Sequence, residues 1–334
     1  MAPVAVISET IGVLRRAPFP RVRVSLSLGT TCLVLTLLSW SLVPLYLRHL
    51  STHVDFWTNN AWRYGASAIF WLPAIFWALH RGQLRARIWR DALVPSLANI
   101  AGQVCLTAAF HEMNPGLVTF GLRTQLVWVA LGALVLVPSE RAIITSRRYL
   151  IGAGVLIAGI LPVMLGGDES LGGLNVAGTS LSIACALGYA MYGLCVRRWM
   201  SPHHPIIAFA VICQLTAAGL IAMMFVFGRD HGMYVPSLDG WILRDLAISA
   251  FFGIAVGHVF YYASIARLGI VITSGVLQLQ PFLVSGASFF IFGERFAWWQ
   301  WIAGTIAVGG AYVMLTSKGS GAKQVSMASS EGGD

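Results

Sequence analysis

The chain has 334 residues, of which 57% are hydrophobic and only 10% are charged, and its mean hydropathy is +0.74. Soluble domains carry roughly 25% charged residues, so this composition excludes a soluble globular protein. The apolar residues gather in segments of about 20, the length that spans the ~30 Å hydrocarbon core of a bilayer. The net charge of +9 would suit nucleic acid. The Lys and Arg residues, however, lie in short segments between apolar spans, which indicates membrane topology and lipid headgroup contact instead.

Ten apolar segments predict an all-α, polytopic membrane protein. A basic arm, 1–24, precedes them and is expected to be cytoplasmic. A cleaved signal peptide is the alternative for this end, but the apolar run from Ser25 is longer than a usual signal core. Residues 318–334, rich in Gly and Ser, are expected to form a disordered cytoplasmic tail. The predicted transmembrane helices are 26–47, 58–79, 92–111, 116–137, 147–166, 176–196, 206–228, 242–264, 270–292 and 298–316.

The distribution of basic residues predicts the orientation. If the N-terminus is cytoplasmic, sixteen of the 22 Lys and Arg residues lie on inner segments. Only Arg48, Arg229, Arg244 and Arg295 lie on the outer side or its edges, and two more arginines lie within spans. Because inner loops of membrane proteins are enriched in Lys and Arg, we expect both termini in the cytoplasm and the chain in the cell (inner) membrane.

An internal repeat relates the two halves. With a shift of 154 positions, residues 109–141 align with 263–295, and ordered glycines and the pair Glu140-Arg141 meet their equivalents. Five spans fall in each half, so the second half enters the membrane in the opposite orientation. We therefore predict two inverted five-helix repeats, residues 25–168 and 169–317. Inverted repeats are typical of alternating-access transporters; a duplication kept for packing alone is the alternative.

On these residues the chain resembles the drug/metabolite transporter superfamily, in particular its EamA-like branch. The matching residues are Trp40, Arg63, Gln280-Pro281 and Gly293-Glu294-Arg295, in their order and spacing. The resemblance implies a secondary carrier that commonly exports amino acids, drugs or other small metabolites through a central cavity. The first half departs from the pattern at Val127, which stands where the second half has Pro281.

Arg123 is the first candidate for substrate binding. It lies about seven residues into the fourth span, ~10 Å along the helix. An arginine near a helix centre costs ~2.5–3.5 kcal/mol on insertion scales, so we expect it to face an aqueous cavity or a partner acid. Its guanidinium suits a carboxylate or phosphate. A structural ion pair or snorkelling to the inner surface is the alternative.

Further candidates for substrate binding lie in four other spans. Gln278, Gln280 and Pro281 occupy the middle of the ninth span, where the proline frees the carbonyl group of Leu277 and predicts a cavity wall or a packed kink. Aromatic and titratable candidates are Trp40, Tyr189 and His258. His258 also suits coupling to protons, with a hydrogen-bonded packing role as the alternative.

Three charged residues are candidates for gating. Glu140 and Glu294 end equivalent spans on opposite faces, where each acid either pairs with an arginine in one state or is a hydrated helix-end charge. Arg63 lies near the outer end of the second span, and for it we expect a structural or gating contact.

Other functional classes fit less well. An intramembrane enzyme is not supported, because His111-Glu112 lacks the second histidine of a zinc protease motif and no aspartate pair lies within the spans. The five cysteines form no CxxC motif, so we expect no metal, cofactor or disulfide. A channel stays open as an alternative. We expect the substrate to be a small polar or amphipathic metabolite, an amino acid or organic anion, that is exported. The other expected partners are the lipid bilayer and a coupling proton or ion. The protein is expected to be a monomer or homodimer.

Overall fold

The computed structural model describes residues 26–136, 141–166, 174–200, 202–268, 273 and 276–330. Within this part of the chain all regular structure is helical. Six predicted spans are single helices: α2 (Leu26–Leu50), α3 (Phe56–His80), α4 (Ala86–Glu112), α8 (Arg147–Gly166), α10 (Pro205–Phe227) and α15 (Trp298–Ser330). The all-α, ten-helix prediction is confirmed.

Three of the other spans are interrupted and the sixth ends in a π-helical turn, neither of which was predicted from the sequence. The fourth is α5 (Pro115–Gly121), the 3₁₀ turn η1 (Leu122–Thr124) and α6 (Gln125–Leu136). The sixth is α9 (Val176–Cys195) followed by the π-helix η4 (Val196–Met200), and the eighth is α11 (Gly240–Ala250), the π-helix η7 (Phe251–Val256) and α12 (Gly257–Leu268). The ninth ends in α14 (Gln280–Phe292). Short connecting helices are α7 (Arg141–Ile144), η5 (Arg229–Gly232) and η6 (Val235–Ser237).

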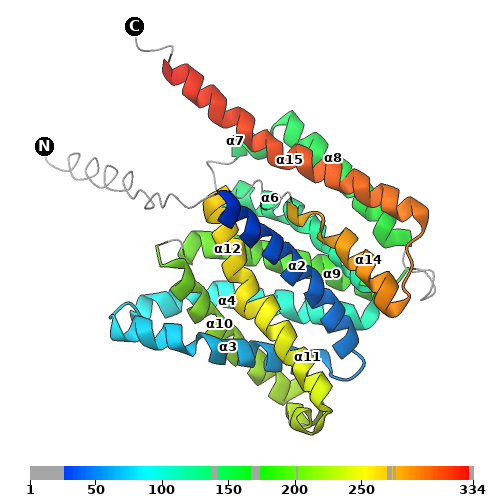
Figure 1. The fold of residues 1–334 in the computed structure, drawn as a ribbon. Helices are drawn as coiled ribbons and strands as arrows, with labels where there is room; N and C mark the ends of the chain where they lie inside the picture. The colour runs from blue at the N-terminus through cyan, green and yellow to red at the C-terminus, as the bar shows by residue number, and fades with distance from the viewer. Residues whose placement is uncertain are drawn as a thin grey trace, which may run out of the picture.

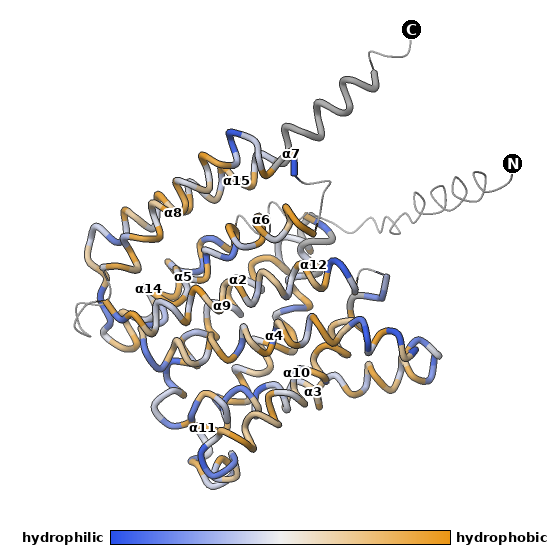
Figure 2. Tube along the Cα trace, turned by 180° about the vertical axis from the view of Figure 1, so that it is seen from behind, coloured by the Kyte–Doolittle hydropathy of each residue, from blue (hydrophilic) through white to orange (hydrophobic). Residues whose placement is uncertain are grey.

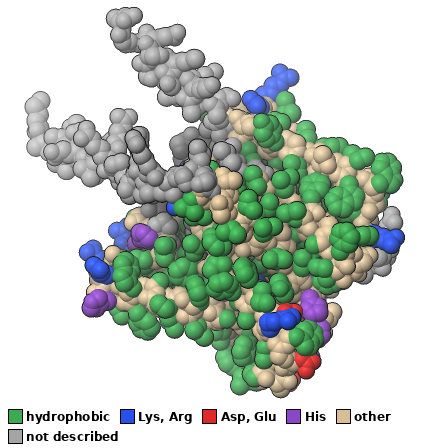
Figure 3. Space-filling model, in the orientation of Figure 1, with side chains coloured by type: hydrophobic (Ala, Val, Ile, Leu, Met, Phe, Trp, Pro, Cys, Tyr) green, Lys and Arg blue, Asp and Glu red, His purple; other side chains and the backbone are tan. Residues whose placement is uncertain are grey.

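The helices have the length and surface of a membrane protein. Seven segments of the described chain are long and apolar enough to cross a bilayer. Three predicted spans, α3, α14 and α15, are not among these seven segments. The helix α14 is short. In α3 and α15, polar residues and tryptophans lower the mean hydropathy. Figure 3 shows a broad hydrophobic face with charged side chains toward its edges, and Figure 2 shows hydrophobic residues along most of the helices. Large apolar side chains such as Phe290, which is 85% exposed, face outward where lipid would lie.

The packing of the helices follows the repeat. The equivalent helices of the two halves pack against each other in three pairs: α3 with α10, α5 with α14, and α8 with α15. The contact of α4 with α9 is matched by that of α12 with α2, as a two-fold exchange of the halves requires. Figure 1 shows α8 and α15 side by side at one edge of the molecule, with α3 and α10 on the opposite side.

Glycines allow the closest of these contacts. A Cβ atom on Gly159 of α8 would lie 2.6 Å from the carbonyl oxygen of Ala303 and 2.7 Å from the Cα atom of Ala307, both in α15. Gly310 of α15 approaches Leu156 of α8 in the same way, with 2.8 Å to its Cα atom. Small residues at helix interfaces let backbones approach closely, which is how helices associate in a bilayer.

The C-terminal segment differs from our expectation. α15 continues as a helix to Ser330, whereas we expected a disordered tail from residue 318. Extending an existing helix requires no new nucleation, and Ala, Lys, Gln and Met in this segment have good helix propensity. Composition alone therefore underestimated the helix.

Candidate functional site

Two equivalent spans are broken at equivalent points. In the fourth span the α-helix gives way to the 3₁₀ turn η1 around Arg123. In the ninth, residues 276 and 277 are helical, Gln278 and Leu279 form a turn, and α14 restarts at Gln280 with Pro281 in its first turn. We expected one kinked helix here; the proline instead begins a new one, a position that needs no N–H group. Discontinuous helices near mid-depth mark the binding region in many transporters.

Arg123 joins the two breaks. Its Nη1 donates to the carbonyl oxygen of Leu277 at 3.0 Å and its Nη2 to Oε1 of Gln280 at 2.9 Å. Its Nε donates to the carbonyl oxygen of Thr119 at 3.2 Å. The expected partner acid is absent from the described residues around it; neutral oxygens serve instead. Arg123 and Leu277 are 154 positions apart, equal to the repeat shift, so this bond joins equivalent positions of the two halves.

Gln280 extends this arrangement to the first span. Its Nε2 donates to the carbonyl oxygen of Trp40 in α2 at 2.6 Å. The Trp40 ring packs edge-on against His258 at 5.5 Å and against Tyr261 at 4.9 Å, both in α12. We call Trp40, Arg123, Leu277 and Gln280 the Arg123 cluster. It brings together residues from spans one, four and nine and touches span eight.

The remaining predicted residues of this region have separate surroundings. His258 stacks on Phe209 at 4.7 Å, and its Nδ1 lies 3.3 Å from the carbonyl oxygen of Ile254. These contacts suit a packing histidine, and its part in proton coupling stays a prediction. Gln278 and Pro281 are buried, so their place in a cavity wall stays a prediction too. Tyr189 of α9 lies outside the Arg123 cluster, against Gly102 of α4.

Arg63 lies at the centre of a second polar group. It is 2% exposed and therefore buried, and the structural or gating contact expected of it stays a prediction. Its Nε donates to Oγ of Ser249 in α11 at 3.0 Å. Tyr64 and Tyr189 are close enough to interact with it electrostatically. Next to it, Ser67 donates to the carbonyl oxygen of Ala250 at 3.2 Å, at the start of the π-helix η7.

An ion pair joins the two halves at the ends that are predicted to be outer. Glu294, after α14, accepts a hydrogen bond from Nε of Arg48 at the end of α2 at 3.2 Å. Arg48 also donates to the carbonyl oxygen of Phe110 at 3.2 Å, and Ser288 donates to the other Glu294 oxygen. We call Arg48 and Glu294 the outer gate. Glu140, its expected inner counterpart, lies outside the described residues.

The fourth span is packed unequally along its length. All seven residues of α5, its outer half, are buried. In α6, its inner half, only Ala130 and Ala133 are buried. Gly116 of α5 lies directly against Ser285 of α14 and Phe296, with 2.8 Å from a Cβ atom to the Phe296 ring. The α5 part of the span is therefore enclosed by its neighbours, whereas α6 carries exposed apolar side chains such as Leu131 and Val135.

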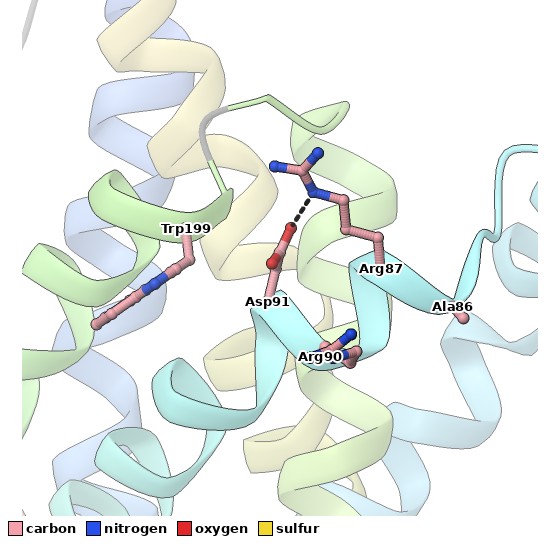
Figure 4. Close-up of a pocket in the computed structure, with 5 residues that line it drawn as sticks. All are labelled: Ala86, Arg87, Arg90, Asp91 and Trp199. Carbon is pink, nitrogen blue, oxygen red and sulfur yellow. Dashed lines mark ion pairs between the residues drawn. The ribbon is translucent and has the colours of Figure 1, made fainter.

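A hollow at the inner end contains none of the predicted site residues. It has a volume of about 480 Å³ and is lined by Ala86, Arg87, Arg90, Asp91 and Trp199. Figure 4 shows the Arg87–Asp91 ion pair, 3.5 Å long, at its edge. Asp91 also pairs with His203 at 2.9 Å, which links the start of α4 to that of α10. The open, arginine-rich lining is what the predicted cytoplasmic face would carry.

Some functional candidates were missed in the sequence. Arg48 was counted only as an outer-edge charge, although Glu294 needed a partner. Asn59 and Asn60, buried side by side in α3, were not singled out. Adjacent amides within an apolar span were the available signal, since polar groups there require partners. Among the described residues, no three His, Cys, Asp or Glu side chains come together as metal ligands.

Comparisons with known proteins agree with this architecture. The model of a family described as the EamA-like transporter family matches residues 27–165 and 176–316. The uncharacterized transporter YdeK of Bacillus subtilis (strain 168) is 28% identical over 149 residues, which are 43% of this chain and 47% of YdeK. The match thus spans about half of that relative. A solved crystal structure of a protein 22% identical has the same fold, with a TM-score of 0.57 over 86% of this chain and 96% of that one.

Proposed function

Because the chain belongs to the EamA-like transporter family and is a multi-pass membrane transporter, we propose that it exports a small anionic or zwitterionic metabolite by alternating access. The observation that carries the proposal is the pair of interior arginines, Arg63 and Arg123. Neither has a carboxylate partner among the described residues. They lie ~10 and ~12 Å from the outer ends of their spans, at similar depth.

Uncompensated positive charge favours an anionic group on the substrate. A buried arginine is costly unless a partner or water stabilises it, so membrane proteins retain such residues where ions or ligands pass. A carboxylate matches the two parallel N–H groups of a guanidinium. The two arginines come from spans two and four, and their neighbours come from both halves, as expected for a site between two rocking units.

The closed outer side supports an inward-facing state. The outer gate and the close contact of α5 with α14 join the halves at one end, whereas α6 at the other end is less buried. With the basic segments in the cytoplasm, as proposed from the charge distribution, substrate would enter from the inside. We propose export because the family resemblance implies it, with both termini cytoplasmic.

A channel is the competing function. It requires a continuous polar path, whereas polar side chains of the Arg123 cluster are held by hydrogen bonds across the helix breaks. We therefore expect the purified protein in liposomes to show saturable uptake of labelled carboxylates that is stimulated by the same compound inside. Unitary conductance without such counterflow would replace the carrier with a channel. Failure of every carboxylate and zwitterion tested would refute the substrate class.

A further inference from the structure

Arg63 has a hydrogen-bond donor that makes no hydrogen bond to the described residues. Its Nε is used by Ser249, but its Nη1 is buried and has no hydrogen-bond partner among the described residues. Leaving a charged N–H group unpaired in the interior is expensive. Arg123 differs, because its Nε, Nη1 and Nη2 each donate to the protein. Of the two interior arginines, Arg63 is thus the one with a donor left for a ligand.

Unpaired amide atoms lie beside this donor. Asn59, one helical turn before Arg63 on the same face of α3, is fully buried, and neither atom of its amide has a described partner. Gln103 of α4 is buried next to Tyr64, and its Oε1 is also without a described partner. Arg63 and Asn59 on one face of α3, and Gln103 on the neighbouring helix α4, therefore hold two donors and two acceptors without a described partner. Native interiors contain few such atoms, and each calls for an explanation.

The helix facing Arg63 has an irregular backbone. Gly253 lies in the π-helix η7, and a Cβ atom there would be 3.2 Å from Nη2 of Arg63 and 2.7 Å from a methyl group of Val43. π-Helical turns are rare and often occur at functional sites. Here the missing side chain leaves the guanidinium next to bare backbone. The unpaired atoms and the π-helix are independent observations that meet at Arg63.

We propose that Arg63 and Asn59 bind the carboxylate of the substrate, and that the substrate is a small monocarboxylate bearing a neutral hydrogen-bond donor, such as a 2-hydroxy acid. This rests on the proposed function and names the substrate class of that same transporter. Nη1 of Arg63 and Nδ2 of Asn59 supply the two donors for the carboxylate. The single proton of the hydroxyl group is donated to Oδ1 of Asn59.

The charge balance distinguishes a hydroxy acid from an amino acid. A monoanion neutralises Arg63, so the occupied site carries no net charge. An amino acid would add an ammonium group where no described carboxylate is available to pair with it. Burying an unpaired charge costs more than burying a hydroxyl group that donates its one proton to an acceptor. The site therefore favours the hydroxyl compound over both the amino and the unsubstituted acid.

Binding requires the halves to separate. Gly253 of span eight lies against Arg63 in this structure, and Val43 of span one lies against Gly253. Helix one also carries the Trp40 carbonyl group that Gln280 binds and the Arg48 side chain of the outer gate. Movement of helix one would thus expose Arg63 as it releases both contacts.

Three acids with one carbon skeleton test the proposal on the full-length protein. Thermal shifts and titration calorimetry would compare 2-hydroxypropanoate, propanoate and alanine, and counterflow in liposomes would follow each. A ligand that binds only the folded protein raises its apparent stability. We expect 2-hydroxypropanoate to bind about fivefold or more tightly than the other two, the effect of one net hydrogen bond. Equal affinity for all three would overturn the assigned class.

Variants locate the binding residues. Arg63→Lys should abolish binding, because lysine cannot offer the paired donors of a guanidinium, and Asn59→Ala should weaken it about fivefold or more. Arg87→Lys, the same change at an exposed inner arginine, should bind as the wild type does. If the Arg63→Lys protein does not fold, the affinity of the Asn59→Ala protein tests whether these residues bind the substrate. Wild-type affinity in Asn59→Ala would mean that these atoms bind water only. Counterflow of other carboxylates without binding of 2-hydroxypropanoate overturns this site alone, whereas absence of all counterflow overturns the proposed function.

Discussion

Glu294→Gln should open the outer side of the transporter. The change keeps the shape of the side chain and removes the charge that Arg48 pairs with at 3.2 Å. The Glu294 side chain is 9% exposed and that of Arg48 21%, so the pair is only partly screened by water. A hydrogen bond to a charged group contributes ~1.5–3 kcal/mol when buried, and exposure reduces this toward the ~0–1 kcal/mol of surface pairs. A loss of ~1–2 kcal/mol shifts the closed-to-open ratio about 5–30-fold.

A cysteine at Ser285 reports the opening. Ser285 is 5% exposed and lies against Gly116 in the sealed outer contact. In a background with the five native cysteines replaced by alanine, the Ser285→Cys thiol should react slowly with a membrane-impermeant methanethiosulfonate added outside. Adding Glu294→Gln should raise the rate about 5–30-fold, as the population of the open state rises.

The matched control is Glu112→Gln. Glu112 is another acid at the outer end of a span, where its carboxylate accepts a hydrogen bond from Asn175 at 3.3 Å in an exposed position. This change should leave the rate unaltered. An unchanged rate in the Glu294→Gln protein, or an equal increase in both, would show that the Arg48–Glu294 pair does not hold the outer side closed.

Three further predictions concern packing, the central arginine and topology. Gly159→Val should lower the melting temperature markedly by forcing α8 away from α15, whereas Gly154→Val, where a Cβ atom meets nothing within 4 Å, should be nearly neutral in the same thermal scan. Arg123→Ala should reduce counterflow at least tenfold while protein abundance is kept, since two acceptors of the ninth span lose their donor; wild-type transport would remove this arginine from the mechanism. A reporter inserted beside Gly82 should read cytoplasmic and one beside Gly232 external, and the reverse pattern would invert the proposed orientation.

The positions of the spans were predictable because hydrophobic length is a strong and local signal. The fifth span, 147–166, coincides with α8, and the others begin or end within a few residues of the prediction. The breaks within the helices were harder to predict from the sequence. A 3₁₀ turn at Arg123 and a π-helix at Phe251–Val256 change the hydrogen-bond pattern without a proline to mark them. Only Pro281 indicated a break in a helix, and the sequence led us to expect a cavity wall or a packed kink there rather than the first turn of a new helix.

The contacts of the site depended on distant partners, which one sequence does not specify. Two groups without a hydrogen-bond partner were predicted separately. One is the guanidinium of Arg123, and the other is the carbonyl group of Leu277, which Pro281 leaves without an N–H donor. The structure shows that each satisfies the other across 154 positions. For Arg63, near the outer end of the second span, a structural or gating contact was expected without a named partner. Its burial comes from α11 and η7, which no local pattern in α3 could indicate.

The hydrogen bond between Arg123 and Leu277 has a consequence for the transport cycle. It joins equivalent positions of two inverted repeats, so it lies where the halves are related by their two-fold exchange. An exchange of conformations between the halves would move the outer and inner ends most and this point least. The bond can therefore persist while the outer gate opens, whereas the Gln280–Trp40 bond, which joins non-equivalent spans, must change. Arg123 would then serve as the pivot, and Arg63, which carries the spare donor, would bind the substrate. The two arginines lie at similar depth but would have different roles, and loss of transport by an Arg123→Lys protein that still binds substrate would separate these roles.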